Sequence, residues 1–427
     1  MEIKLKDSGI PWIGAIPQHW ERLNMKRNVS FHKGSIPKQW SDVPLEIPYL
    51  SMDYLRGRGD GSTLFPIHDS SLLIANENDL LVLWDGANAG EFIRSKYGYV
   101  GSTMAKLSYN PEKLNHDYLF FFLKSLEIVS KDFANGTTIP HFTPTFLAGN
   151  YPIPPLEEQK QIAAWLDSKC YEIDELIEVE QQMISELEAS RQAVITEAVT
   201  HGLNPDVPMT ESGCDWFTSH PVNWKIERIK NLFAKRAEKN NPIKTKERLS
   251  LSIDKGITLY ADKTTNLDRF KDDFTQYQLA HPNDIVLNSM NMIVGAVGKS
   301  AYYGCVSPVY YVIYGKSTNV DMDYYGYLLN IPLIRDVYHK LGQGIYAIER
   351  GDGRVNTCRL KVDYYEFSMI HVPVPSVEEQ TAIANYLNEK NKEIDELIKV
   401  KQEKIETLKQ YRQSLIFEAV TGKTKVN

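Results

Sequence analysis

Apolar residues recur at intervals of three, four and seven in two long, mostly polar segments, residues 151–205 and 372–427. In each segment a Pro-x-Pro stretch runs into a Glu-Glu-Gln sequence, at 152–159 and at 373–380. Proline favours extended backbone and acidic side chains stabilise a helix start, so we expect a helix to begin at these glutamates. The apolar positions then form a narrow stripe of the coiled-coil type. In the order of the two segments they are Ile173, Ile177, Ile184, Leu187, Val194 and Ala198, and Ile394, Ile398, Ile405, Leu408, Leu415 and Ala419.

The two stripes predict two long helices that pair with each other. About 40 residues at 1.5 Å each correspond to a rod of about 60 Å. The alternative is that each helix is solvated and packs only on its own domain. Each stripe has a charged gap near its middle, Glu180 in the first and Lys401 in the second, at equivalent positions. In an antiparallel pair these residues would lie close together and set the register; two independently solvated side chains are the alternative.

The chain also repeats itself outside the stripes. The opening of each half shares a Ser-Gly pair followed by a Trp, a Pro and a Trp at a constant offset of 204. These residues are Trp12, Pro17 and Trp20, and Trp216, Pro221 and Trp224. We expect the opening tryptophans to be core anchors.

Between the shared edges the two halves resemble each other only weakly. This pattern predicts a duplicated scaffold that carries two different middle blocks. The expected divisions are residues 1–150 and 206–371 for the middle blocks, and residues 151–205 and 372–427 for the repeated helical segments.

Each middle block has the pattern of a mixed α/β domain. Residues 79–84 and 284–287 are short apolar runs that predict buried strands. Residues 117–123 and 323–329 predict short apolar helices, and their aromatic side chains are expected in the core.

Charge and composition limit the classes of protein to which this sequence could belong. Hydrophobic residues make up 42% and charged residues 24%, as in ordinary globular proteins, and no apolar stretch is long enough for a membrane span. The first residues lack an apolar run, so we expect no secretory signal, and four scattered cysteines fit a reducing cytoplasm. The net charge of −7 is concentrated in residues 151–200, which hold 3 basic and 11 acidic residues. The middle blocks are therefore near neutral, and charge permits DNA binding without demonstrating it.

Motifs for catalysis are not found in the sequence. Residues 289–300 end in Gly-Lys-Ser, but a phosphate-binding loop needs glycine where Ile293 stands. We find no Asn-Pro-Pro-aromatic loop of adenine methyltransferases, no Gly-rich cofactor turn and no metal-ligand spacing among the ten histidines.

With these residues in view, the chain resembles the specificity (S) subunits of type I restriction-modification enzymes. The resemblance lies in residues 7–20 (Asp-Ser-Gly-Ile-Pro-Trp to Trp20) and in the paired Pro-x-Pro-x-x-Glu-Glu-Gln helices, and the duplicated layout spans nearly the whole chain. The second opening departs from the first at Cys214, Asp215, Phe217 and Thr218, which affects only the edge of the second domain.

The resemblance implies an α+β fold: two similar mixed α/β target-recognition domains in a pseudo-twofold arrangement, separated by two long helices in an antiparallel coiled coil. It implies a non-catalytic subunit that recognises an asymmetric, interrupted double-stranded DNA site. It further implies two modification subunits that bind S-adenosylmethionine, and restriction subunits that use ATP and Mg²⁺, with no cofactor in this chain.

Residues that could contact DNA are polar side chains in loops next to glycine, and lysines or arginines near them. Arg pairs with guanine, Asn and Gln pair with adenine, and Lys binds phosphate. The base-reading candidates are Arg56, Arg58, Asn88, Thr137, Thr138, His141, Asn288, Asn291, Gln343, Arg350, Arg354 and Asn356. The phosphate candidates are Lys33, Lys38, Lys235, Arg236, Lys239, Lys244 and Lys246. For each of them the alternative is an ordinary surface side chain.

Three other functions stay open at this point. The chain could be the specificity subunit of a type IIB-like system, a cryptic DNA-modifying or nicking enzyme, or a scaffold that pairs helices without reading DNA. The target sequence and its spacer length cannot be read from the residues.

Overall fold

The computed structural model describes residues 4–57, 63–127, 141–253, 255–263, 273–345 and 359–426. These residues divide into two compact units, each built from two separate stretches of chain. Unit 1 comprises residues 1–181 and 402–427, and unit 2 comprises residues 182–401. Each unit therefore contains one middle block and parts of both long helices.

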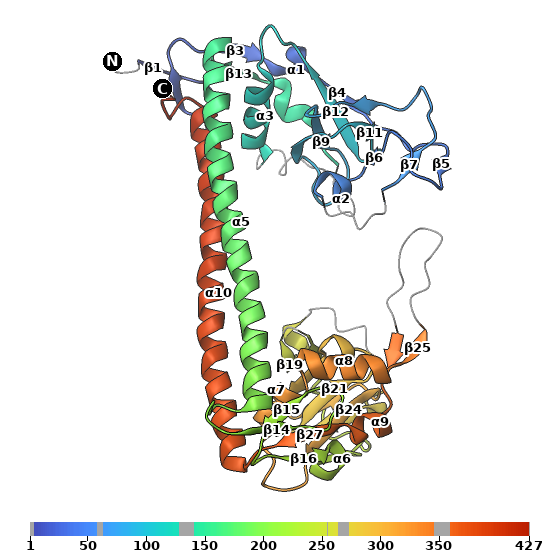
Figure 1. Ribbon diagram of the computed structural model, residues 1–427. Coiled ribbons are helices and arrows are strands. Elements are labelled where there is room, and N and C mark those ends of the chain that lie inside the picture. Colours follow the sequence, from blue (N-terminus) through green and yellow to red (C-terminus); the bar gives the residue numbers. More distant parts are fainter. Residues whose placement is uncertain are drawn as a thin grey trace. The chain divides into compact units, whose positions relative to one another are not determined.

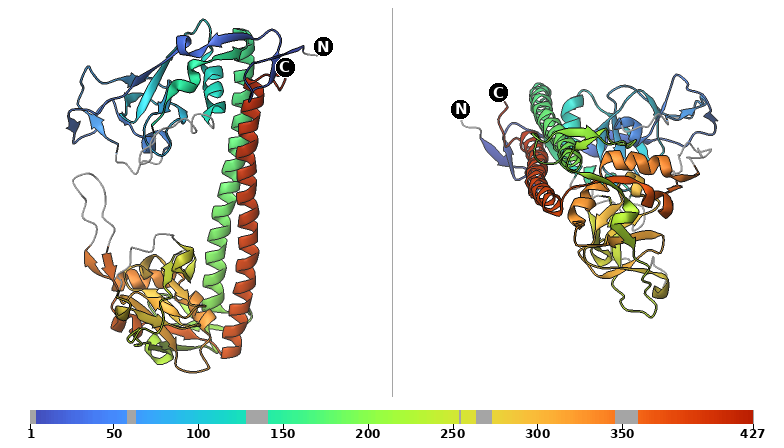
Figure 2. Two further views of the ribbon diagram at one scale, coloured as in Figure 1. Left: turned by 180° about the vertical axis from the view of Figure 1, so that it is seen from behind. Right: turned by 60° about the horizontal axis from the view of Figure 1, so that its bottom comes forward.

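The two long helices are α5 (Leu156–His201) and α10 (Val377–Val420). Each begins just before the Glu-Glu-Gln sequence, as the pattern predicted. Within unit 1 the first half of α5 lies against the last part of α10, and within unit 2 the last part of α5 lies against the first half of α10 (Figure 1). The views in Figure 2 show the same lengthwise pairing in each unit. The predicted pair of long helices is confirmed, and the two helices run antiparallel.

Unit 1 is built around a four-stranded antiparallel sheet in the order β10-β9-β12-β4. The strands of this sheet are β10 (Phe92–Arg94), β9 (Leu80–Leu83), β12 (Met104–Tyr109) and β4 (Val29–Lys33). A smaller sheet has the order β6-β11-β8 (Tyr49–Leu50, Gly98–Val100, Ile74–Ala75). Three strand pairs complete the unit: β1–β2 (Leu5–Asp7, Ala15–Pro17), β3–β13 (Glu21–Asn24, Asn150–Ile153) and β5–β7 (Trp40–Ser41, Phe65–Pro66). Its short helices are α1 (Met25–Asn28), α2 (Met52–Leu55), α3 (His116–Ser125) and η1 (Pro144–Ala148).

Unit 2 contains a four-stranded sheet of the same topology, in the order β22-β21-β24-β17. Its strands are β22 (Val297–Lys299), β21 (Ile285–Asn288), β24 (Tyr310–Gly315) and β17 (Phe233–Lys235). Three strand pairs have counterparts in unit 1: β14–β15 (Met209–Glu211, Ser219–Pro221), β16–β27 (Lys225–Arg228, His371–Val374) and β20–β23 (Gln278–Ala280, Gly304–Val306).

Two further strand pairs of unit 2 are β18–β19 (Leu249–Ser252, Gly256–Leu259) and β25–β26 (Gln343–Ile345, Arg359–Lys361). Its helices are α6 (Ile229–Leu232), α7 (Met322–Leu328), α8 (Pro332–Leu341) and α9 (Tyr364–Met369), with 3₁₀ turns η2 (Tyr260–Asp262), η4 (Phe274–Gln276) and η5 (Met292–Val294). The predicted strands are confirmed as β9 and β21, and the predicted apolar helices as α3 and α7. The mixed α/β fold class is therefore confirmed.

The hydrophobic core of each unit includes both long helices at equivalent positions. The core of unit 1 includes Leu166 from α5 and Ile416 from α10, and the core of unit 2 includes Leu387 from α10 and Ile195 from α5. Burying one such side chain stabilises a fold by about 1.5–3 kcal/mol, so each unit depends on the helix end that the other half of the sequence supplies.

The opening tryptophans only partly fit the expectation of core anchors. Trp20 and Trp224 are buried, but Trp12 is 37% exposed, and its ring lies 6.2 Å from those of Tyr151 and Phe417. The prediction for Trp12 is wrong because Ile13 and Ile16, the apolar neighbours in the same motif, take the interior places. Gly422 ends α10 against this motif at a φ of +71°, where a Cβ would lie 2.4 Å from Pro17 Cδ.

Candidate nucleic-acid interface

A buried glutamine joins each long helix to the domain that precedes it. Gln159 accepts a hydrogen bond from the backbone N–H of Asn115 (2.7 Å), the residue that caps α3. Gln380 accepts one from the backbone N–H of Asp321 (2.8 Å), the residue that caps α7. Each glutamine also donates from Nε2 to two backbone carbonyls. The last residue of the Glu-Glu-Gln sequence therefore holds the short helix of each domain to the helix pair.

A buried tyrosine makes a second repeated contact, and this one reaches the helix end from the other half of the sequence. Tyr118 on α3 donates to the carbonyl of Val420 (3.2 Å), and Tyr324 on α7 donates to the carbonyl of Val199 (2.9 Å). Carbonyls in the last turn of a helix have no partner within the helix, so these hydroxyls satisfy groups that would otherwise be buried without one. Burial raises the pKa of both tyrosines well above the usual value, so both hydroxyls stay protonated donors.

A third repeated feature is the turn that enters the central strand of each sheet. Asn78 and Asn283 adopt positive φ values of 65° and 71°, which asparagine tolerates better than most residues. The carboxylate of the next residue closes the turn: Asp79 accepts from the N–H of Asn76 (2.7 Å), and Asp284 accepts from the N–H of His281 (2.8 Å). Because both turns are alike, β9 and β21 begin in the same way, and the loops that follow them leave equivalent positions in the two sheets.

The loop after β9 carries a cluster of charged side chains at the end of the sheet. Asp85 lies 2.7 Å from Lys33 Nζ at the end of β4 and 2.6 Å from His141 Nδ1. Partial burial would raise the pKa of the Asp85 carboxyl, but hydrogen bonds from Lys33 and His141 outweigh burial and lower it. At the other end of the loop Arg56 pairs with Glu91 at 2.5 Å. The exposed Asn88 lies between these two ion pairs in the sequence.

Two basic residues at the end of β17 in unit 2 lie against aromatic rings. Arg236 makes a two-pronged contact with Asp284 (2.6 and 2.8 Å) and lies over the ring of Tyr314. Hydrogen bonds and charge from Asp284 raise the pKa of this guanidinium. Lys235 is exposed, with its ammonium 5.0 and 4.7 Å from the ring centroids of Tyr311 and Tyr364. Arg236 is thus engaged by the turn before β21, whereas Lys235 presents its charge at the surface.

A carboxylate that sequence reasoning did not single out lies among the predicted phosphate contacts of unit 2. Glu238 pairs with Lys244 (2.5 Å) and with His281 (2.7 Å). These hydrogen bonds lower the pKa of Glu238, the one from Lys244 most. The signal available in the sequence was an acidic residue within a basic stretch, which does not specify its partners.

The other candidate contacts occupy varied places. Lys38 is 3.3 Å from Asp69, whose pKa is lowered chiefly by the backbone N–H of Ser71. Asn288 is the half-buried last residue of β21. Four further candidates are exposed: Asn291, Gln343, Lys239 and Lys246. Others lie outside the described residues: Arg58, Thr137, Thr138, Arg350, Arg354 and Asn356. Contact with DNA stays a prediction for all of them.

The helix pair carries two reciprocal ion pairs. Arg412 of α10 lies 3.2 Å from Asp174 of α5 in unit 1, and Arg191 of α5 lies 2.5 Å from Asp395 of α10 in unit 2. The repeat offset of 221 relates the two pairs, since Asp174 corresponds to Asp395 and Arg191 to Arg412, so the repeat contained the signal, although sequence reasoning did not use it.

The predicted pairing residues occupy the inner side of the helices in varying degree. Ile173 and Ile405 are buried, and Ile177 and Leu408 pack against the core of unit 1. Ile184, Leu187, Ile394 and Ile398 are half-buried. Glu180 is only 6% exposed and lies 2.6 Å from Lys404, and Lys401 Nζ lies 2.9 Å from Met183 Sδ. The predicted closeness of Glu180 and Lys401 stays a prediction.

The described residues provide neither a membrane-spanning helix nor a cluster of metal ligands. None of the helices found there combines the length and the apolar character needed to cross a membrane. Within the same residues, no three His, Cys, Asp or Glu side chains gather closely enough to hold a metal ion.

Comparison with known proteins connects this framework to one family. Residues 23–189 match the family described as "Type I restriction modification DNA specificity domain". The chain is 28% identical over 431 residues to the type I restriction enzyme MjaVIII specificity subunit of Methanocaldococcus jannaschii, covering 96% of this chain and 94% of that protein. It is also 23% identical over 201 residues, 44% of each chain, to the putative type I restriction enzyme MjaX specificity subunit of the same organism.

One solved structure has the same fold along nearly the whole chain. It is described as "Structural basis underlying complex assembly and conformational transition of the type I R-M system", and it aligns with a TM-score of 0.64 at 15% identity over 96% of this chain and 99% of its own. The matching domain and the full-length relative agree: residues 23–189 match the type I restriction modification DNA specificity domain, and the chain as a whole is similar to a type I restriction enzyme specificity subunit.

Proposed function

We propose that the chain selects the DNA target of its complex by reading two different half-sites, one with each unit. The observation that carries the proposal is the framework that occurs twice with unlike loops. Gln159 and Gln380, Tyr118 and Tyr324, and the two Asn-Asp turns make matching contacts in both units. Two units with the same framework and different surface loops suit an asymmetric DNA site, whereas two identical units would require a palindromic site.

The loops after β9 and β21 are the proposed reading surfaces. Asn88 and Asn291 are exposed there, and an asparagine amide can make two hydrogen bonds to adenine. Lys33 and Lys235 end the outer strands of the two sheets, where an ammonium group can meet a phosphate.

The long helices are the proposed spacer between the half-sites. The 46 residues of α5 correspond to about 69 Å at 1.5 Å per residue, about two turns of B-DNA at roughly 34 Å each. A seven-residue insertion in both helices is expected to change the number of base pairs between the half-sites and to leave the half-sites themselves unchanged.

We also propose that the chain carries no catalytic group of its own. Two modification subunits, which would bind S-adenosylmethionine and methylate adenine, dock on the helices in this proposal. Restriction subunits would supply ATP- and Mg²⁺-dependent cleavage. The full chain alone, given S-adenosylmethionine or Mg²⁺ with DNA, is then expected neither to methylate nor to cut.

Mapping methylated adenines in cells tests the proposal directly. Cells that express the modification subunits with this chain are expected to show one gapped, asymmetric motif, and cells without the chain are expected to lose it. A chain whose residues 206–371 come from another member of the family should alter one half-site only. The proposal would be contradicted if cells without the chain kept the methylated motif, or if the exchanged domain changed both half-sites at once.

A further inference from the structure

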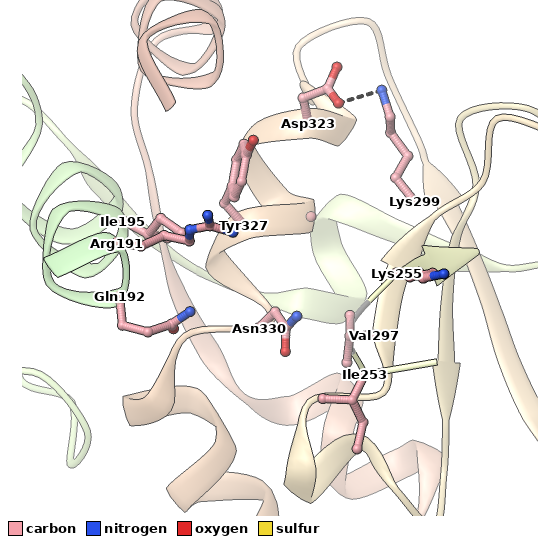
Figure 3. A pocket seen from close by; sticks show the side chains of 12 residues that line it. Arg191, Gln192, Ile195, Ile253, Lys255, Val297, Lys299, Asp323, Tyr327 and Asn330 are labelled. Carbon is pink, nitrogen blue, oxygen red and sulfur yellow. Dashed lines mark ion pairs between the residues drawn. The ribbon is translucent and has the colours of Figure 1, made fainter. Parts of the chain in front are cut away.

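Unit 2 contains a pocket of about 470 Å³ that the reading of DNA does not explain. It opens between the C-terminal half of α5, the β18–β19 hairpin, β22 and α7. Figure 3 shows Asn330 between Gln192 and Val297, with the ion pair of Lys299 and Asp323 along one edge. The volume falls in the range of pockets that hold small molecules.

The corresponding place in unit 1 can be identified residue by residue. Asp117 and Tyr118 begin α3 as Asp323 and Tyr324 begin α7, and the two tyrosines make the equivalent contacts described above. Counting on from these residues, Phe120 corresponds to Gly326. Arg94 corresponds to Lys299 in the same way, because these residues pair with the first residues of β9 and β21, Leu80 and Ile285.

An aromatic ring occupies this place in unit 1. The guanidinium of Arg94 lies 4.5 Å from the centroid of the Phe120 ring and pairs with Asp117 at 3.0 Å. In unit 2 the cation and its ion pair are kept, as Lys299 and Asp323, but glycine stands in place of the ring. A cation beside an aromatic face is a favourable arrangement. Unit 2 has the cation, Lys299, but no ring at position 326.

The space beside Gly326 is open. A Cβ built at this glycine would meet only the Cβ of Lys299, at 3.9 Å, which is ordinary contact. Gly326 lies within α7, where glycine is a poor helix former compared with alanine. Position 326 therefore has room for a side chain, and glycine leaves that part of the pocket empty.

The polar groups of the lining favour an acidic ligand. Arg191 is paired with Asp395, and Lys299 with Asp323. Lys255 is exposed and makes no ion pair with any residue that the structure describes. The amide oxygen of Asn330 is buried and, within the same described residues, accepts no hydrogen bond.

We propose that this pocket binds a small aromatic acid, with its ring in the space that the Phe120 ring takes in unit 1 and its acid group toward Lys255. The ring would lie against the Lys299 side chain as Phe120 lies against Arg94. The carboxylate would supply the opposite charge that Lys255 lacks. A hydroxyl or N–H on the ring could donate to Asn330. This inference concerns unit 2 alone and does not depend on which bases the chain reads.

The test uses phenylacetate as the probe and the full chain with labelled isoleucine and valine methyl groups. Saturable shifts are expected for Ile195, Ile253 and Val297, which line the pocket. Phenethylamine, which has the same ring and the opposite charge, should bind at least about tenfold more weakly. Equal binding of the two probes, or no saturable shift at these methyl groups, would overturn the proposal.

Two exchanges between the halves sharpen the test. Gly326→Phe should fill the pocket and abolish the shifts, and Phe120→Gly should create a second set of shifts in unit 1. Thermal melting checks that each variant folds. If Gly326→Phe does not fold, Lys255→Gln decides: a loss of at least about tenfold in phenylacetate affinity supports the proposal, and unchanged affinity overturns it.

Discussion

Tyr118 and Tyr324 show what a single residue contributes in this molecule. Each is fully buried, and each hydroxyl supplies the hydrogen bond that a carbonyl at the end of a long helix lacks. A buried acceptor left without a partner costs about 1–3 kcal/mol, which is a large part of the stability of an ordinary domain. The two tyrosines therefore serve as anchors for helix ends and not as DNA contacts.

Replacing either tyrosine with phenylalanine removes only the hydroxyl. Tyr118→Phe and Tyr324→Phe are each expected to lower the free energy of unfolding by about 1–2 kcal/mol, measured by urea denaturation of the full chain. Tyr365→Phe is the matched control, because Tyr365 is 63% exposed. If the buried and exposed variants are equally stable, the carbonyls have another source of hydrogen bonds.

The ion pairs of Asp85 should make the stability of unit 1 depend on pH. Its pKa is lower in the folded chain, so its stabilising effect is present above the usual carboxyl pKa of about 3.9 and is lost as the pH falls through the folded value. The effect should stay below about 1 kcal/mol, because Lys33 and His141 are largely exposed.

The measurement is the melting temperature of wild type and Asp85→Asn between pH 7 and pH 3. The two proteins are expected to differ at pH 7 and to converge as the pH falls. Asp42→Asn, which changes an exposed carboxyl elsewhere in the same unit, is the control. A constant difference across this range would show that the ion pairs of Asp85 do not stabilise the fold.

The long helices show how much a pattern predicts at the scale of an element. Their start, their length and the apolar stripe follow from proline, the acidic first turn and the three-four spacing, and α5 and α10 agree with all three. The choice of ionic partners does not follow from spacing alone. Glu180 pairs with Lys404, a partner that the spacing did not single out, and its predicted closeness to Lys401 stays a prediction.

Charge exchange tests the role of Glu180 in the helix pair. Glu180→Lys is expected to destabilise the chain by about 1–3 kcal/mol, since this carboxylate is almost fully buried. Adding Lys404→Glu should restore part of that loss, with a coupling energy above about 0.5 kcal/mol in a double-mutant cycle. A second cycle with Lys401→Glu measures the pairing predicted from the sequence, and strict additivity there would remove it.

Other parts of the site could not be predicted because they depend on contacts between distant segments. Asp85 and His141 are far apart in sequence, and their contact requires the sheet to be in place. The repeated turns were visible as Asn-Asp pairs, but their positive φ and their aspartate closures appear only in three dimensions. The prediction that Trp12 is buried was wrong for a related reason. Ile13 and Ile16 of the same motif are buried instead, and the sequence does not show which of the apolar side chains turn inward.

At the scale of the whole molecule, each unit is completed by chain from the opposite half of the sequence. Unit 1 takes residues 402–427, and the core that they join includes Leu415, Ile416 and Val420. Each unit therefore combines one middle block with helical segments from both halves of the sequence.

Deleting residues 402–427 tests this dependence. The deletion exposes apolar side chains that contribute about 1.5–3 kcal/mol each, so unit 1 should lose its protection from hydrogen exchange while unit 2 keeps most of its own. A synthetic peptide of residues 402–427 added in excess should restore protection in unit 1. Undiminished protection in residues 4–127 of the shortened chain would contradict the expectation.

The composition of unit 1 also affects how the chain folds during its synthesis. The ribosome makes residues 1–181 before residues 182–401, and residues 402–427, which complete the core of unit 1, follow only after these. At roughly 5–20 residues per second, translation of residues 182–427 takes tens of seconds, and during this time the core residues of unit 1 are not fully buried. Unit 2 is finished earlier, although it begins later. Until residues 402–427 have been made, the core of unit 1 is therefore exposed to aggregation and to chaperone binding.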